Sequence, residues 1–295
     1  MANNIELAKA FVPILDEVYK VASLTSKLDG DPALARQGAN ANELIIPMLS
    51  MQGLGDYSRN DGYARGDVTM THETVKCNFD RGRKFYVDSL DEQETEKTAF
   101  SRLAGEFIRT KVVPEVDAFR FATYAGKAGI SKVAAGTTLA DGEAVLKALR
   151  EATNKMDEDE VPVEDRHLFI TPTLDAMIAD LDKTKSRDIL ERFASKTLVP
   201  QTRFYTAINQ LDGKPGSEEV GGYQKAAGAA NINFMVIHKA ALIQYPKHVA
   251  PKIKGPEDDN DGDRYMFGYR NVGIADVYAN KLAGIYLHHT AASEG

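Results

Sequence analysis

Apolar residues recur with helical spacing in three stretches of the chain. In residues 5–28 they fall every three or four positions, which predicts an amphipathic helix that docks on the body or, as we favour, on a neighbouring subunit. A second, much longer helix is predicted from the capping box Ser89-Leu90-Asp91-Glu92 to about residue 125. Pro114 lacks an amide hydrogen and is expected to kink this helix near its middle. Residues 138–195 predict a helix-strand-helix unit.

Short apolar or alternating runs predict the strands. Residues 30–66 are rich in Gly, Asn and Asp around one apolar run, and we interpret them as an extended arm with a single strand at 43–48. Residues 67–79 and 84–88 are expected to pair as a hairpin around a turn at 80–83. The first of these runs is polar on both faces for much of its length, so the hairpin should project from the body.

The C-terminal third is predicted to be mainly strand. Its strand-like runs lie at residues 231–238 and 265–278, before an apolar end at 282–287. Together with the helices of the first two thirds, these strands place the chain in the α+β class.

The composition is that of an ordinary globular protein. Hydrophobic residues make up 43% and charged residues 27% of the 295 residues, which is too apolar for a disordered chain. No run approaches the roughly 20 apolar residues that span a bilayer, and the first residues lack the pattern of a signal peptide. We therefore expect a protein that is made and used in a cytoplasm and that has no membrane partner.

The charge of the chain argues against a dedicated nucleic-acid binder. The formal net charge is -7, and the basic residues are spread along the sequence. Proteins that grip DNA usually concentrate lysine and arginine on one face.

Local motifs for metal binding or catalysis are incomplete. The acidic run 257–263 places Asp259, Asp261 and Gly262 at the third, fifth and sixth positions of a calcium loop. The twelfth position is Gly268, where such a loop needs a bidentate glutamate, so a solvated acidic turn is favoured. We assign no metal, no cofactor and no catalytic residue.

The histidines and the cysteine are given structural roles. His288 and His289 are adjacent, would point to opposite faces of a strand, and are interpreted as part of a solvent-exposed tail. Cys77, the single cysteine, cannot form an intrachain disulfide. It has no sequence-adjacent histidine or tight basic cluster to lower its pKa, so it is expected to pack as a small apolar group.

The order of these elements, together with four diffuse sequence stretches, carries a resemblance to a known family. The stretches are Gly53-Leu54-Gly55-Asp56-Tyr57-Ser58-Arg59 with Gly62-Tyr63, Phe85-Tyr86-Val87-Asp88 with Leu90-Asp91-Glu92-Gln93-Glu94, Val113-Pro114-Glu115-Val116-Asp117-Ala118-Phe119-Arg120, and Tyr265-Met266-Phe267-Gly268-Tyr269-Arg270. Over nearly its whole length the chain resembles the major capsid proteins of tailed bacteriophages, which have the Hong Kong 97 (HK97) type of capsid fold.

The resemblance implies a division of the chain. Residues 1–60 would be the N-arm, 61–90 the E-loop, 91–137 the P-domain with its spine helix, 138–230 the A-domain, and 231–295 a return to A- and P-domain strands with a C-terminal tail. No lysine and acid here match the positions of the covalent crosslink of the founding member, so that chemistry is not carried over.

The resemblance also implies the partners. The protein would not be an enzyme but would assemble with itself into the pentamers and hexamers of an icosahedral virion capsid, formed in the bacterial host cytoplasm around double-stranded DNA without sequence-specific binding. Further expected partners are a portal, a separate scaffolding protein and decoration proteins. The residues that we predict at subunit interfaces are Tyr57, Arg59, Arg81, Arg83, Lys84 and Asp88.

Two alternatives stay open at this point. An encapsulin-like nanocompartment shell would share the fold and would store a cargo enzyme in place of a genome. A soluble metal-dependent hydrolase, from a different functional class, would require the acidic loop and the scattered histidines to converge in space. Particle contents would test the first alternative, and bound metal after dialysis would test the second.

Overall fold

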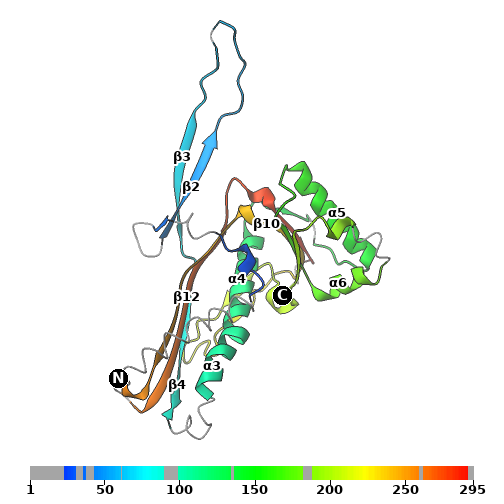
Figure 1. Ribbon diagram of the computed structural model, residues 1–295. Helices are drawn as coiled ribbons and strands as arrows, with labels where there is room; N and C mark the ends of the chain where they lie inside the picture. The colour runs from blue at the N-terminus through cyan, green and yellow to red at the C-terminus, as the bar shows by residue number, and fades with distance from the viewer. Residues whose placement is uncertain are drawn as a thin grey trace.

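The computed structural model describes residues 23–30, 36–37, 43–60, 62–89, 99–133, 136–181, 188–258 and 262–291. A slender hairpin rises from one end of the body, a long helix runs beside a narrow three-stranded sheet, and two helices cover a five-stranded sheet (Figure 1). The mixture of helices and largely antiparallel strands confirms the α+β class.

The projecting hairpin consists of β2 (Glu43–Met51) and β3 (Val68–Lys76). The two strands pair antiparallel from Glu43 opposite Lys76 to Met51 opposite Val68, and residues 52–67 connect them at the tip. The two-residue strand β1 (Arg36–Gln37) pairs with the other edge of β2. The strand predicted at 43–48 is therefore confirmed, although it belongs to the hairpin.

The pairing predicted for residues 67–88 is wrong. The expected turn at 80–83 lies inside one continuous strand, β4 (Phe79–Asp88), which pairs with β12 and not with β3. Gly82 is needed for a different reason than a turn, because a Cβ there would lie 2.8 Å from the carbonyl oxygen of Tyr269 on the neighbouring strand. The expectation that a hairpin projects is confirmed, with β2 as the partner of β3.

The long helix beside the narrow sheet has three parts. These are α3 (Ala99–Phe107), a π-helical segment (Ile108–Val112) and α4 (Val113–Gly126). Pro114 is the second residue of α4, which directly follows the π-helical segment. The predicted long helix is confirmed over these residues. The kink at Pro114 stays a prediction, and a π-helical segment lies just before this proline.

The narrow sheet has the order β11-β12-β4. Strand β12 (Arg264–Val277) was expected, whereas β11 (Leu242–Lys254) was not. The inner face of this sheet packs on the long helix through a cluster that includes Phe79, Ile108, Val116 and Phe267.

The wide sheet has the order β5-β13-β10-β6-β7. Its strands are β5 (Ser131–Lys132), β6 (Arg166–Ile170), β7 (Ser195–Leu198), β10 (Ile232–His238) and β13 (Ile285–His289). Helices α5 (Gly142–Glu158) and α6 (Pro172–Ala179) pack on one face through Leu149, Ile178 and Phe234, which confirms the helix-strand-helix unit (Figure 1). The side chain of Asp141 caps α5 by accepting a hydrogen bond from the amide of Ala144 at 2.8 Å.

Short elements complete the described chain. A small hairpin is formed by β8 (Ile208–Gln210) and β9 (Tyr223–Lys225). Single 3-10 turns lie at Ser26–Leu28, Gln201–Arg203, Lys239–Ala241, Pro256–Asp258 and Leu282–Gly284.

Two predicted helix segments fall largely outside the described residues. The amphipathic helix at 5–28 can be followed only over its last residues, which form an irregular stretch and the 3-10 turn instead of an α-helix. The capping box at Ser89 continues into residues that the structure does not describe. Ser89 itself donates a hydrogen bond to the carboxylate of Asp263 at 2.5 Å.

Candidate subunit interface

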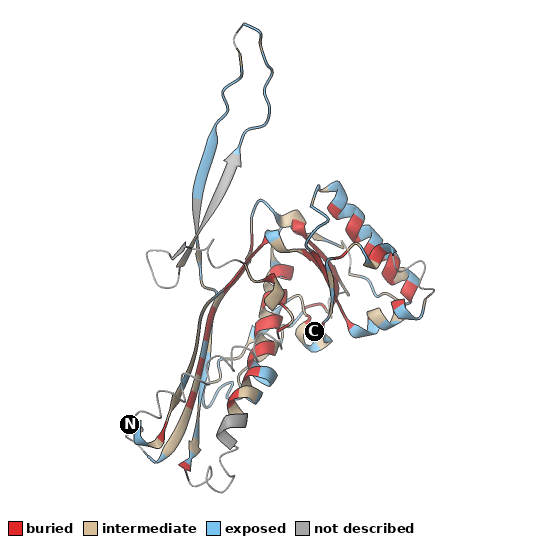
Figure 2. Cartoon of the chain, viewed as in Figure 1, coloured by how far each residue is buried: buried red, intermediate tan, exposed pale blue. Residues whose placement is uncertain are grey.

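The tip of the β2–β3 hairpin exposes large apolar side chains. Leu54 is fully exposed, Tyr63 is 88% exposed and Tyr57 is 61% exposed. The rings of Tyr57 and Tyr63 contact each other at a centroid distance of 5.0 Å, next to a bridge between Ser58 and Gly62. The hairpin stands away from the body, and its described side chains are largely solvent-exposed (Figure 2). Exposed apolar groups at the end of a long projection are typical of a surface that contacts another molecule.

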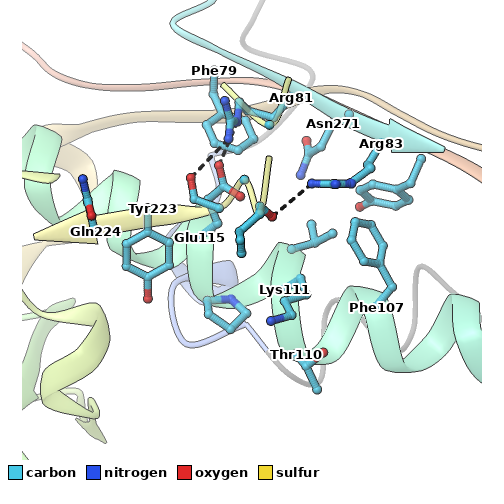
Figure 3. A pocket seen from close by; sticks show the side chains of 18 of the residues that line it. Phe79, Arg81, Arg83, Phe107, Thr110, Lys111, Glu115, Tyr223, Gln224 and Asn271 are labelled. Atoms are coloured by element: carbon cyan, nitrogen blue, oxygen red, sulfur yellow. Dashed lines mark hydrogen bonds and ion pairs between the residues drawn. The ribbon is translucent and has the colours of Figure 1, made fainter. Parts of the chain in front are cut away.

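Arg81 is held inside its own chain. Its Nε donates to Glu115 Oε1 at 2.8 Å, and its Nη2 donates to the carbonyl oxygens of Leu211 at 2.6 Å and Gly222 at 3.2 Å. Burial raises the pKa of Glu115, although the Arg81 guanidinium opposes this shift. Arg81 therefore joins strand β4, helix α4 and the loop between β8 and β9 (Figure 3).

Arg83 holds the same loop one position further along the strand face. Its two terminal nitrogens donate to the carbonyl oxygens of Val220 and Glu219, both at 3.0 Å. The loop can turn beneath these guanidinium groups because Gly213, Gly216, Gly221 and Gly222 all have positive φ angles. We call Arg81, Arg83 and residues 211–222 the loop clamp.

A groove of about 1280 Å³ lies between the loop clamp and the long helix. Phe107, Thr110 and Lys111 line it from the helix, and Tyr223 lines it from β9 (Figure 3). Burial raises the pKa of Tyr223 to about 12, and its hydroxyl donates to the carbonyl oxygen of Thr202 at 2.9 Å. The groove is therefore lined by aromatic and polar side chains together.

Lys84 and Asp88 lie on the opposite face of β4. The Lys84 ammonium stands over the ring of Tyr86 at 5.4 Å, and the Arg264 guanidinium lies 4.7 Å from the centroid of the same ring. Asp88 is exposed and lies opposite Arg264 in the register of β4 and β12. The six predicted interface residues thus fall into three places. Tyr57 and Arg59 lie at the hairpin tip, Arg81 and Arg83 belong to the loop clamp, and Lys84 and Asp88 lie on the outer face of the narrow sheet.

His288 corrects the prediction of an exposed tail. It lies in β13, is only 3% exposed, stacks on Phe234 with a centroid distance of 5.0 Å, and contacts Asn233 at 3.0 Å and Thr137 at 3.2 Å. Burial, reinforced by the neighbouring His289, lowers its pKa to about 4. Its sequence gave no sign of this burial, since the partners come from distant parts of the chain.

Cys77 contributes to a small apolar cluster around Tyr245 and Ile274, as expected for a small apolar group. Burial raises the pKa of its thiol.

Within the described ranges, no three His, Cys, Asp or Glu side chains gather as a metal site would require. The predicted acidic turn at 257–263 includes 259–261, which are outside those ranges. No helix among the described residues is long and apolar enough to cross a membrane.

Sequence reasoning missed one extensively bonded polar residue of the body. Asp117 is fully buried on α4 and accepts hydrogen bonds from residues near the beginning of the described chain. One signal could have revealed it. Asp117 follows Val113 by four residues and precedes Phe121 by four, so the three residues lie on the same buried face of α4. A charged residue at such a position requires partners.

Comparison with known proteins gives matches in structure only. No protein family and no curated protein matches the chain. Solved structures match along most of its length: one of Mycobacterium phage Che8 has a TM-score of 0.59 at 11% identity and covers 90% of both chains. The capsid structure of the cyanophage P-SCSP1u has a TM-score of 0.58 at 14% identity, with 88% of this chain and 86% of that chain covered.

The chain has the phage capsid fold. A virus-like particle from Pyrococcus furiosus shares it as well, with a TM-score of 0.60 at 13% identity over 93% of this chain and 95% of that chain. The resemblance drawn from the order of the elements is confirmed at the level of the fold. The projecting hairpin, the long helix with its narrow sheet, and the helix-covered wide sheet are the parts of this capsid fold in the present chain.

Proposed function

We propose that the protein is the major capsid protein of a tailed bacteriophage, which assembles with itself into pentamers and hexamers of an icosahedral shell around double-stranded DNA. The projecting hairpin is the observation that carries this proposal. It presents Leu54, Tyr57 and Tyr63 to solvent on a capsid fold, at the end of two nine-residue strands. Apolar side chains in such a place gain stability when a neighbouring copy covers them.

Extended contacts between copies would explain the shape of the subunit. A hairpin that lies across a neighbour adds buried area far from the body, and repeated copies related by symmetry can close into a shell. The net charge of -7 suits a wall that does not grip the enclosed DNA. Tyr57 and Arg59 are proposed as direct contacts, whereas Arg81 and Arg83 would shape the receiving surface through the loop clamp. Lys84 and Asp88 are proposed as contacts on the outer face of the narrow sheet.

The division of the chain into the domains of a phage capsid protein is also a proposal. We assign the N-arm, P-domain and A-domain as the resemblance implies, with one change that the strand pairing requires. The E-loop is proposed to be the whole hairpin from Glu43 to Lys76, because β2 and β3 form a single projecting element. A portal, a separate scaffold and decoration proteins are proposed as further partners in the virion.

Assembly of the purified chain tests the proposal. The full chain, expressed with and without a candidate scaffolding protein, would be examined by size-exclusion chromatography and negative-stain electron microscopy. Rings, tubes or closed polyhedral particles are expected. In a matched variant, residues 53–66 would be replaced by Asn-Gly, which keeps the paired strands and removes the exposed tip. This variant should remain folded and unassembled. A wild-type chain that stays monomeric under all these conditions would contradict the proposal.

An encapsulin-like shell is the second candidate, favoured by the fold shared with the virus-like particle of Pyrococcus furiosus. Both candidates predict closed particles, so the contents must distinguish them. Nuclease-protected DNA of uniform length in native particles would support the phage capsid. A co-purifying cargo protein in stoichiometric amount, without DNA, would support the storage shell.

A further inference from the structure

Residues 23–30 cross the junction between the two sheets. They run beside α4, which packs with its first turns on the narrow sheet and with Phe121 and Tyr124 on the wide sheet (Figure 1). Leu28 is 1% exposed and belongs to the core shared by α4, the wide sheet and the C-terminal end of β12. This short segment therefore contacts both halves of the body.

Asp117 fixes the beginning of the segment. Its carboxylate accepts hydrogen bonds from Ser23 Oγ at 3.0 Å, the amide of Leu24 at 3.1 Å, the amide of Thr25 at 3.3 Å and Thr25 Oγ1 at 2.7 Å. Arg203, just after β7, supplies a cation at 3.5 Å. A fully buried carboxylate is stable only when its lone pairs are used in this way.

Arg120 and Gln244 hold the middle of the segment. Arg120 donates to Thr25 Oγ1 at 2.8 Å and to Asp29 Oδ1 at 3.1 Å. Gln244, on β11, donates to the carbonyl oxygen of Thr25 at 2.8 Å and to Asp29 Oδ1 at 2.7 Å, and it accepts from the Tyr124 hydroxyl at 2.6 Å. The segment is thus bonded to α4 and to the narrow sheet at the same time.

Lys27 and Gly30 attach the segment at its far end. The Lys27 ammonium donates to Ser195 Oγ at 2.6 Å and to Thr197 Oγ1, both on β7 of the wide sheet. The amide of Gly30 donates to the carbonyl oxygen of Gln244 at 2.8 Å, and a Cβ on Gly30 would lie 2.6 Å from the Tyr245 ring. Each sheet therefore holds the segment through its own contacts.

We propose that residues 23–30 are a clasp that ties the wide sheet to the narrow sheet, and that Asp117 is the residue that closes it. A displacement of residues 23–25 from Asp117 would be transmitted to the narrow sheet through Gln244 and to the wide sheet through Lys27. An open clasp would allow the angle between the two sheets to vary and would yield irregular assemblies. This consequence for assembly rests on the proposed capsid function. The clasp itself is a property of the single subunit.

Limited trypsin digestion of the unassembled full chain tests the clasp directly. Cleavage between Lys27 and Leu28 requires that the segment leave its site, and mass spectrometry identifies the fragment that begins at Leu28. Asp117→Asn keeps the size of the side chain, but it places an NH2 group against the N–H and O–H donors of residues 23–25. This cleavage should therefore become about tenfold faster, as expected for the loss of one net hydrogen bond to a charged group. Glu143→Gln, the same kind of change at an exposed position on α5, is the matched control and should change the rate less than twofold.

Further variants keep the test decisive. If Asp117→Asn does not fold, Thr25→Val removes the hydroxyl that links Asp117 to Arg120 and should accelerate the same cleavage by a smaller factor. Unchanged cleavage in the folded variants would overturn the clasp, whether or not the wild type forms shells. Faster cleavage together with a lower fraction of closed particles in electron micrographs would support the full proposal. Faster cleavage with the wild-type fraction of closed particles would confine the clasp to the subunit and overturn its role in assembly.

Discussion

Arg81 on strand β4 and Glu115 on helix α4 form an ion pair with a nitrogen-to-oxygen distance of 2.8 Å, and their side chains are 27% and 13% exposed. The pair does more than join a strand to a helix. Because Arg81 also donates to the carbonyl oxygens of Leu211 and Gly222, the same guanidinium fixes the loop that closes one side of the groove. The surface that would receive a neighbouring copy thus depends on a contact inside the subunit.

Replacing Arg81 by methionine should destabilise the subunit by about 2 kcal/mol, because Glu115 would lose its cation and two loop carbonyls would lose a donor. Urea unfolding measures this change, and hydrogen exchange should show lost protection in residues 211–222. Arg109→Met is the control, since its pair with Glu106 is largely exposed and should contribute less than about 0.5 kcal/mol. Equal losses in the two variants would contradict the role of the loop clamp.

His288 should make the subunit sensitive to acid. The ring is neutral in the folded protein, and its contact with the Asn233 amide nitrogen indicates that Nδ1 accepts a hydrogen bond that protonation would abolish. Its folded-state pKa is about 4, below the ordinary value of 6.5, so its contribution to stability is complete above pH 6.5 and is lost as the pH falls toward 4. The full loss corresponds to about 3 kcal/mol.

The measurement is the unfolding free energy of the wild type and of His288→Gln between pH 7 and pH 4. Burial also lowers the pKa of His167 and His238, but these residues titrate in both proteins, so the difference isolates His288. The glutamine variant should lose less stability on acidification. His289→Gln, at a half-buried neighbouring position, removes only the smaller of the two causes that lower the His288 pKa, so its curve should lie close to the wild-type curve with a slightly smaller loss on acidification. Parallel curves for the wild type and His288→Gln would refute this prediction.

Periodicity predicted the long helix, α5 and α6, because each buries an apolar stripe, whereas residues 23–28, predicted as the end of a helix, form an irregular stretch and a 3-10 turn. The long helix up to about residue 125 and the helix-strand-helix unit at 138–195 appear where the sequence placed them. The partner of β3 was not predictable in this way. Strand pairing depends on contacts between distant segments, and the Gly82 that suggested a turn is present because the backbone of β12 approaches closely.

Other parts escaped prediction because their signals are ambiguous. Strand β11 contains Pro246 and Pro251, which usually interrupt strands but are tolerated at the edge of a sheet, where β11 lies. Of the candidate interface residues, Tyr57 and Arg59 stand on the projecting tip, whereas Arg81 and Arg83 turned out to have intrachain acceptors. Sequence shows that an arginine needs a partner, but it does not show whether that partner belongs to the same chain.

Two glycines in helices should respond in opposite directions to substitution by alanine. A Cβ on Gly142, in the first turn of α5, would lie 2.2 Å from the carbonyl oxygen of Met177 on α6, so Gly142→Ala should cost about 3 kcal/mol by forcing the helices apart. At Gly105, within α3, no described atom beyond the adjacent helix backbone lies within 4 Å of a Cβ, and Gly105→Ala should stabilise the subunit by about 0.5–1 kcal/mol. Thermal unfolding of both variants checks the pair. A stabilising Gly142→Ala would show that α5 and α6 are not packed as closely as described.

The hairpin tip should matter for assembly and not for folding. Leu54 is fully exposed, so Leu54→Asp should change the unfolding free energy by less than about 0.5 kcal/mol, while a charge buried against a neighbouring copy should prevent shell formation. Val163→Asp introduces the same charge at a 45% exposed position on the body and should leave assembly intact. Sedimentation of both variants under conditions in which the wild type forms particles provides the measurement. If Leu54→Asp assembles as well as the wild type, the tip does not contact a neighbour, and the interface must lie elsewhere on the subunit.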